Sequence, residues 1–304
     1  MDTNRVTDLS FSTGLQQEVQ SLMQQYNKYN LQAESGQKLT YPSDDPVAVG
    51  RVFTLRAEKS TIAQYNRNGD NVKTILDTTY ASLKQLQELK TCVDSLAIDT
   101  SSELGLSKFS ISSVQVNQFI EQAFTLLNSK FSGKYLFGGV TVSAEPFVAT
   151  RDSYNNITAV TYRGTPSTVS VAMSVYVAEN TSIRPFTSGL VNENLRDFVN
   201  HLIDLRTALN NRSAPDVRTQ INVLKDDENN LLSAQGLVTG NMTRLDIATT
   251  QNSSRFIALG DQISRDADTN FDEVAIQVSN AMRAYQIAIQ SGAKIMSVSV
   301  LDYL

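Results

Sequence analysis

Three acidic or amide side chains near the C-terminus have a spacing that could bind a cation. Asp266, Asp268 and Asn270 occupy alternate positions, as in the first half of an EF-hand calcium loop. That loop also needs glycine at its sixth position and glutamate at its twelfth, where this chain has Phe271 and Gln277. We therefore interpret the stretch as a polar turn that caps the last helix, and the sequence predicts no metal site.

The single histidine and the single cysteine are the other candidates for chemistry. His201 lies between apolar residues of a helical pattern, so we expect it between helices or at their flank. Cys92 adjoins Val93 on another helical pattern, where a small buried side chain is expected. The sequence has no phosphate-binding loop, dinucleotide glycine pattern or nucleophile elbow. It predicts no catalytic residue and no cofactor, so the chain is not expected to be an enzyme.

Composition narrows the class of partner. The chain has 304 residues, with 26 Lys and Arg against 31 Asp and Glu, and no long block of like charge. This mildly acidic balance argues against nucleic acid or an anionic membrane as the main partner. The start of the chain is polar and has no basic-then-apolar leader. We expect a protein that is cytoplasmic or is exported without cleavage of a signal peptide.

The positions of proline predict the secondary structure. All six prolines lie between positions 42 and 215, so 47–145 and 216–304 lack the main helix breaker and are predicted to form long helices. Between them, 134–187 is rich in Val, Thr, Tyr, Ser and Gly. Ile157 to Tyr162 and the alternating apolar residues of 169–177 predict strands. The expected fold is mainly α with a small β insertion.

Both ends of the chain carry a narrow apolar seam with alternating spacings of three and four, which is typical of a helix packed against a partner helix. The simplest architecture is a long antiparallel helical rod or coiled coil formed by the N- and C-terminal arms. The predicted seam residues are Leu15, Val19, Leu22, Tyr26, Val274, Val278, Ala281, Tyr285 and Ala288.

Residues 35–46 separate the first two helical patterns, and we expect a structural corner there. Gly36 can adopt the left-handed conformation that ends a helix, and Pro42 keeps its predecessor out of helical geometry. Asp44 and Asp45 offer oxygens to the first N–H groups of a new helix, whose first turn accommodates Pro46.

Three stretches of this sequence resemble the flagellin superfamily. The corner from Ser35 to Pro46 resembles its N-terminal signature, and the run from Ala284 to Leu304 is similar to its terminal helix. The proline after the two aspartates, together with Gly133-Lys134-Tyr135-Leu136-Phe137-Gly138-Gly139, is closest to the hook-filament junction proteins of the hook-associated protein 3 type.

This resemblance implies a structural component of the bacterial flagellum. It implies export through the flagellar type III system without signal cleavage, and an extracellular place between the hook side and the flagellin filament. The implied partners are copies of itself, hook-associated protein 1, flagellin, the filament cap and an export chaperone. The terminal arms are implied to be disordered in the monomer and to pair on assembly.

We accordingly expect three domains. They are a terminal coiled-coil arm pair (1–42 plus 265–304), a helical rod (43–133 plus 190–264) and an outer β domain (134–189). Two alternatives to a junction protein stay open at this point: a flagellin-type filament subunit and a soluble coiled-coil adaptor.

Overall fold

The structure is a computed structural model that describes residues 3–101, 108–164 and 174–301, with side chains for 13–101, 108–164 and 174–294. Its helices and strands follow one another in the order α1 (Thr3–Ser35), α2 (Pro46–Ser101), α3 (Phe109–Leu127), β1 (Lys130–Phe131), β2 (Lys134–Tyr135), β3 (Phe147–Arg151), β4 (Ile157–Tyr162), β5 (Val175–Ala178), β6 (Thr181–Ile183), α4 (Gly189–Asn210), α5 (Ala214–Ala267) and α6 (Phe271–Leu301). None of the helices that the structure describes is long and apolar enough to cross a membrane.

The chain divides into two compact units. The terminal unit comprises Met1–Thr61 and Arg255–Leu304, and the central unit comprises Ile62–Ser254. Helices α2 and α5 each contribute residues to both units. The three domains expected from the sequence do not have the same boundaries as these two units, and that division stays a prediction.

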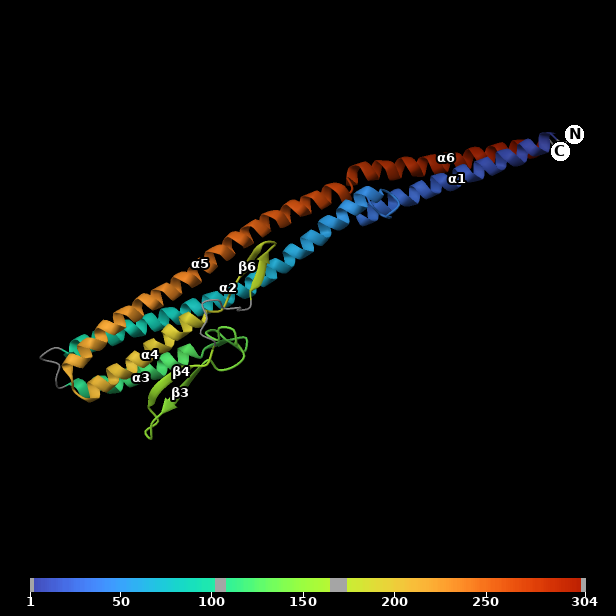
Figure 1. Ribbon diagram of the computed structural model, residues 1–304. Helices are drawn as coiled ribbons and strands as arrows, with labels where there is room; N and C mark the ends of the chain where they lie inside the picture. The colour runs from blue at the N-terminus through green and yellow to red at the C-terminus, as the bar shows by residue number, and fades with distance from the viewer. Residues whose placement is uncertain (1–2, 102–107, 165–173, 302–304) are drawn as a thin grey trace. The chain divides into compact units, whose positions relative to one another are not determined.

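The terminal unit contains the pair of helices from the two ends of the chain. Helix α1 packs along α6, and Figure 1 shows them side by side in blue and red. They run antiparallel, because Leu15 lies beside Gly292 whereas Gln37, after the end of α1, pairs with Asp268, before the start of α6. A Cβ atom at Gly292 would lie 2.5 Å from Cδ2 of Leu15, so the absence of a side chain there permits the close approach.

The central unit contains a continuous apolar core. Helix α3 packs on α4, and strand β4 also packs on α4. The middle of the chain supplies three separate two-stranded antiparallel hairpins, β1–β2, β3–β4 and β5–β6. In β3–β4, Phe147 pairs with Tyr162 and Ala149 with Val160, so that Phe147 and Val160 turn their side chains into the core. The predicted strand at Ile157 to Tyr162 is confirmed as β4.

The sequence also predicts that the third helix stops at Ser132-Gly133 and that Gly69-Asp70 weakly interrupts the second helix, and both predictions need correction. The third helix does not continue to Ser132-Gly133 but ends at Leu127. Ser132 and Gly133 both have positive φ, 48° and 77°, and form the two-residue turn between β1 and β2, a turn type that requires such angles at both positions. Helix α2 continues through Gly69-Asp70, since a glycine costs a helix only about 1 kcal/mol. A bend bracketed by Gly236 and Gly240, which the sequence also predicts, stays a prediction.

Two further expectations fall partly outside the described ranges. The sequence also predicts a turn at 99–105, but 99–101 belong to α2, and the rest of the predicted turn lies outside the described residues. Of the alternating run 169–177, the structure describes Val175 and Val177, which belong to β5.

Candidate assembly interface

The two seams predicted from the sequence lie on helices that the structure brings together. On α1, the side chains of Leu15, Val19, Leu22 and Tyr26 are partly buried. On α6, Val274 and Ala281 are buried, and Val278, Tyr285 and Ala288 are partly buried. None of these nine side chains is fully exposed. Their part in assembly between subunits stays a prediction.

The outward sides of α1 and α6 differ in chemistry. Helix α1 exposes amides, including Gln16, Gln20 and Gln24. Helix α6 exposes Ile276 at 63% and Ile287 at 62%. They lie roughly 160° and 140° around the helix from the centre of the seam, because each residue advances the helix by about 100°. The outward side of α6 therefore presents uncovered aliphatic side chains among its polar residues.

The corner after α1 is built by residues that the sequence singled out. Gly36 has a φ of 68° and its N–H donates to the carbonyl oxygen of Gln32, 3.0 Å away, which ends the helix in the left-handed conformation. Oδ1 of Asp45 accepts hydrogen bonds from the N–H groups of Val47 and Ala48, at 3.1 and 2.9 Å, and so caps α2. Pro46 is the first residue of α2, where no N–H is needed.

Asp44 stabilises the loop instead of the helix. Its Oδ2 accepts hydrogen bonds from the N–H groups of Thr40 and Tyr41, and its Oδ1 lies 2.8 Å from Nζ of Lys28 on α1. The hydrogen bond from Lys28, followed by that from the Tyr41 backbone, holds the pKa of Asp44 below its usual range. Pro42 is exposed within this loop. The carboxylate thus ties the corner back onto α1.

The corner is also hydrogen-bonded to the short segment between α5 and α6. The N–H of Lys38 donates to the carbonyl oxygen of Ala267 at 2.7 Å, and the N–H of Thr269 donates to that of Gly36 at 3.0 Å. Nε2 of Gln32, which is buried, donates to the carbonyl oxygen of Lys38 at 2.8 Å. The two interruptions of the helices therefore face each other and are linked by main-chain hydrogen bonds.

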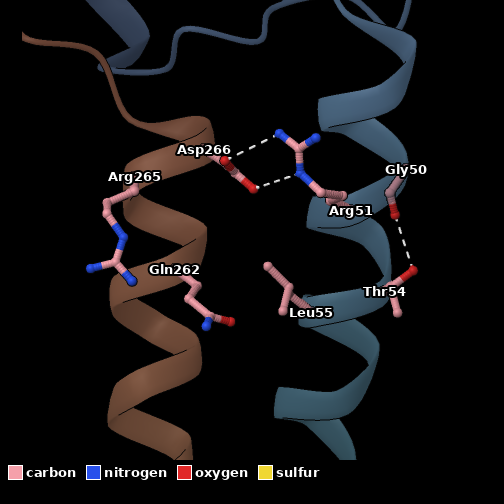
Figure 2. Close-up of a pocket in the computed structure, with 7 residues that line it drawn as sticks. All are labelled: Gly50, Arg51, Thr54, Leu55, Gln262, Arg265 and Asp266. Atoms are coloured by element: carbon pink, nitrogen blue, oxygen red, sulfur yellow. Dashed lines mark hydrogen bonds and ion pairs between the residues drawn. The ribbon is translucent and has the colours of Figure 1, made fainter.

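A groove of about 590 Å³ lies beside this corner, between α2 and α5 (Figure 2). Arg51 reaches across it to Asp266, with Nε and Nη2 at 3.2 and 3.3 Å from the two carboxylate oxygens. This fork-to-fork hydrogen bonding raises the pKa of Arg51. Arg265 and Gln262 complete the α5 wall (Figure 2). The guanidinium and the carboxylate neutralise each other, and the pair links α2 to α5 across the groove.

The calcium-like spacing does not gather its side chains around one point. Asp266 pairs with Arg51, and Asp268 accepts a hydrogen bond from the hydroxyl of Ser264. Oδ1 of Asn270 accepts from the N–H of Asp272 at 3.2 Å, which caps α6. Each side chain already has a structural partner nearby.

The remaining candidates lie in the central unit. Nδ1 of His201 on α4 is 2.8 Å from Oδ2 of Asp227 on α5, so His201 links two helices. Burial raises the pKa of Asp227, an effect opposed by the hydrogen bond to His201. Cys92 is exposed, and the expectation of a buried thiol is wrong. It lies about 100° around α2 from Val93, outside the buried face. Leu136 and Phe137 of the glycine-rich stretch are fully buried in the core.

Sequence reasoning missed the ion pairs that fix the corner, Lys28 with Asp44 and Arg51 with Asp266. Lys28 and Arg51 lie outside the apolar patterns of their helices, so the sequence does not single them out. Only the folded structure shows that each lies close to its aspartate. The two adjacent aspartates at the corner were the sequence feature that could have indicated basic partners.

The comparisons with known proteins agree with this architecture. Residues 6–141 match the family model of the bacterial flagellin N-terminal helical region. A search of the curated proteins found no match.

The chain is similar in structure to a flagellar hook-associated protein from Vibrio parahaemolyticus, with a TM-score of 0.64, 20% identity, and 74% of this chain and 100% of that chain covered. It is also similar to FlgL of Bacillus cereus, with a TM-score of 0.59 and 19% identity over 69% of this chain and 99% of that one. For FlgL of Xanthomonas campestris the TM-score is 0.54 and the identity 13%, over 69% and 99%.

At these identities the solved structures establish the fold, and the resemblance in sequence is carried by residues 6–141. The predicted fold class, mainly helical with small antiparallel strand pairs, is confirmed. Residues 6–141 thus resemble the bacterial flagellin N-terminal helical region, and the chain has the fold of the flagellar hook-associated proteins.

Proposed function

We propose that this chain is a structural component of the bacterial flagellum that joins the hook side, through hook-associated protein 1, to the flagellin filament. The observation that carries the proposal is the combination of a flagellin N-terminal helical region with the hook-associated fold, in which the two ends of the chain pair as α1 and α6. A junction protein needs surfaces for neighbours and no catalytic centre, which agrees with the expectation that the chain is not an enzyme.

The modest burial of the described side chains in the terminal unit supports assembly through this unit. Its seam consists of partly buried side chains and of the buried Val274 and Ala281. Such a pair offsets little of the entropy lost on ordering two long helices. Neighbouring subunits that cover the outward faces would supply the missing burial. The sequence-based division into an arm pair, a rod and an outer β domain is retained as part of this proposal.

The proposal also includes the binding partners of the chain and its route of export. We expect copies of this chain, hook-associated protein 1, flagellin and the filament cap to be its neighbours in turn. An export chaperone and passage through the flagellar type III channel, without cleavage of a signal peptide, complete the proposal.

Deletion of the gene from its flagellated host tests the role. Hooks without filaments, with unpolymerised flagellin in the medium, are the expected result under electron microscopy and immunoblotting. Filaments that remain attached would reject a junction role. If the deletion strain exports no other filament protein, the alternative of a flagellin-type subunit is favoured. The match to the flagellin N-terminal region also permits that alternative.

Single substitutions test the part played by the seam. Leu22→Asp or Val278→Asp should prevent assembly, because a carboxylate would be buried between α1 and α6, yet each should leave the chain soluble. Complementation of the deleted strain, with sedimentation of the purified variant, provides both readouts. Normal filament attachment by either variant would contradict the proposal.

A further inference from the structure

A small apolar pocket lies on the outward side of the corner in the terminal unit. Its volume is about 150 Å³, and cavities of that order can hold a six-carbon group. Tyr41 and Phe53 line it although they are 54% and 69% exposed, and Arg56 lies at its rim. The remaining lining residues are Gln37, Leu39, Thr40, Pro42, Val49, Val52 and Ala267. Exposed aromatic side chains around a pocket are typical of a surface that is covered by a partner.

Helix α6 of the same unit carries a side chain with the complementary character. Ile276 is 63% exposed and lies two residues from each of the seam residues Val274 and Val278, on the side of α6 that faces away from α1. Asp272 and Glu273 precede it by four and three residues and are exposed on the same side. Ile276 is therefore an aliphatic side chain flanked by two carboxylates.

The charges of the two surfaces match. Arg56 forms no ion pair with any residue that the structure describes, and neither does Asp272 or Glu273. A guanidinium at the rim of an apolar pocket would attract an acidic partner, and carboxylates that flank an exposed isoleucine would attract a basic one. The aliphatic side chain has the size to enter the pocket, and the carboxylates are placed to reach its rim.

We propose that the pocket formed by Tyr41, Phe53 and their neighbours receives Ile276 of a second copy of this chain, with Asp272 or Glu273 of that copy facing Arg56. The inference rests on the proposed assembly role and names the contact that repeats within it. Because the donating and receiving surfaces differ, a copy can receive one neighbour while inserting into another, as a repeating assembly requires. A single contact of this size is too small for a stable dimer, so it acts as one of several in the array.

Zero-length cross-linking of the purified full-length chain tests the contact. The variant Arg56→Lys keeps the charge and supplies an amine, which a water-soluble carbodiimide couples to a carboxylate in direct contact. Equal amounts of ¹⁴N and ¹⁵N chain are mixed at high concentration and treated, and the peptides are identified by mass spectrometry. We expect mixed-isotope peptide pairs that join the lysine introduced at position 56 to Asp272 or Glu273, and a gel ladder that continues beyond dimers.

A matched pair of isoleucine variants separates the specific contact from chance collisions. In the Arg56→Lys background, Ile276→Ala should reduce the mixed-isotope product by about tenfold or more, because it removes the aliphatic group that fills the pocket. Ile287→Ala should leave the yield unchanged, since Ile287 has nearly the same exposure, 62%, but lies three turns further along α6.

Three results would overturn the inference. They are the absence of mixed-isotope pairs, a yield that Ile276→Ala does not lower, and a ladder that stops at dimers. The gene-deletion experiment is independent of this measurement. Cross-links that persist when deletion leaves filaments attached would reject the junction role and retain the self-contact, whereas filament loss without cross-links would do the reverse.

Discussion

The terminal unit and the central unit bury their residues in different ways. The main apolar core extends from Val72 to Ala248 in the sequence, and all its described members belong to the central unit. Among the side chains that the structure describes in the terminal unit, the buried apolar ones are mainly small or isolated: Ala48, Val52, Leu259, Ala267, Val274 and Ala281. It is held instead by backbone hydrogen bonds at the corner and by ion pairs such as Lys28 with Asp44.

This difference suggests separate roles for the two units, with the central unit responsible for folding and the terminal unit for assembly. We expect the central unit, with its continuous apolar core, to be the more stable one, because the terminal unit has long helices, a narrow seam and exposed isoleucines. A subunit with this distribution can be a folded monomer before its ends are covered by neighbours. Four measurements test this difference between the two units.

The largest effect on stability is expected in the central unit. Phe198 on α4 is 1% exposed within the core, and Phe198→Ala should lower the free energy of unfolding by about 3–5 kcal/mol, because it removes a large buried side chain and leaves a cavity. Urea unfolding followed by circular dichroism measures the change. Leu237→Ala, at a position that is 62% exposed on α5, is the control and should change it by about 0.5 kcal/mol or less. Equal losses in both variants would contradict the comparison.

A substitution in the seam should affect the terminal unit alone. Val278→Asp should weaken the pairing of α1 with α6 by about 2 kcal/mol, from the loss of apolar burial and the desolvation of a carboxylate. Hydrogen exchange should show faster exchange of amides in both helices and unchanged protection in α4. Ile287→Asp, on the outward side of α6, is the matched control. Reduced protection of α4 in the Val278 variant would mean that the two units fold as one.

The cap at the corner should have a smaller effect. Asp45→Ala should cost about 1 kcal/mol, because the N–H groups of Val47 and Ala48 lose their acceptor. The change should be confined to the first turn of α2 and is measured by exchange of those amides. Asp45→Asn, which retains a capping oxygen, should cost only a few tenths of a kcal/mol. Similar losses for the alanine and asparagine variants would show that the cap contributes little.

Two aspartates should respond to pH in opposite directions. The pKa of Asp44 is lowered from 3.8, so its carboxylate stabilises the corner above pH 3.8, and this contribution is lost as the pH falls through the folded-state pKa. The pKa of Asp227 is raised from 3.8, so its contribution is greatest when it is protonated and is lost as the pH rises from 3.8 through its folded-state pKa. Carbon-13 NMR titration of the side-chain carboxyl groups measures both. Titration of Asp44 at the higher pH of the two would contradict the assigned partners.

Much of the fold could be predicted because its elements are long and have local signals. The distribution of prolines indicated helices where α2, α5 and α6 are found. The residues at the corner identified its turn and its cap, since Gly36 and Asp45 act on atoms only a few residues away. The seams, likewise, followed from spacing alone.

Expectations failed where a feature depends on packing at a distance. Exposure of Cys92 is set by which side of α2 meets the core, and Val93 beside it is fully buried. The turn at Ser132-Gly133 resembles a helix stop in sequence, but pairing of β1 with β2 makes it a hairpin. The link from Lys38 to Ala267 joins residues far apart in the chain and leaves no local signal.

That link has a mechanical consequence. The breaks at Gly36 and Ala267 lie at the same level and are fastened by a two-stranded bridge, so the two polypeptide segments cannot slide past each other without breaking main-chain hydrogen bonds. The short non-helical segments beside the bridge can still change their dihedral angles. The corner therefore opposes relative sliding of the two segments and leaves those dihedral angles free to adjust.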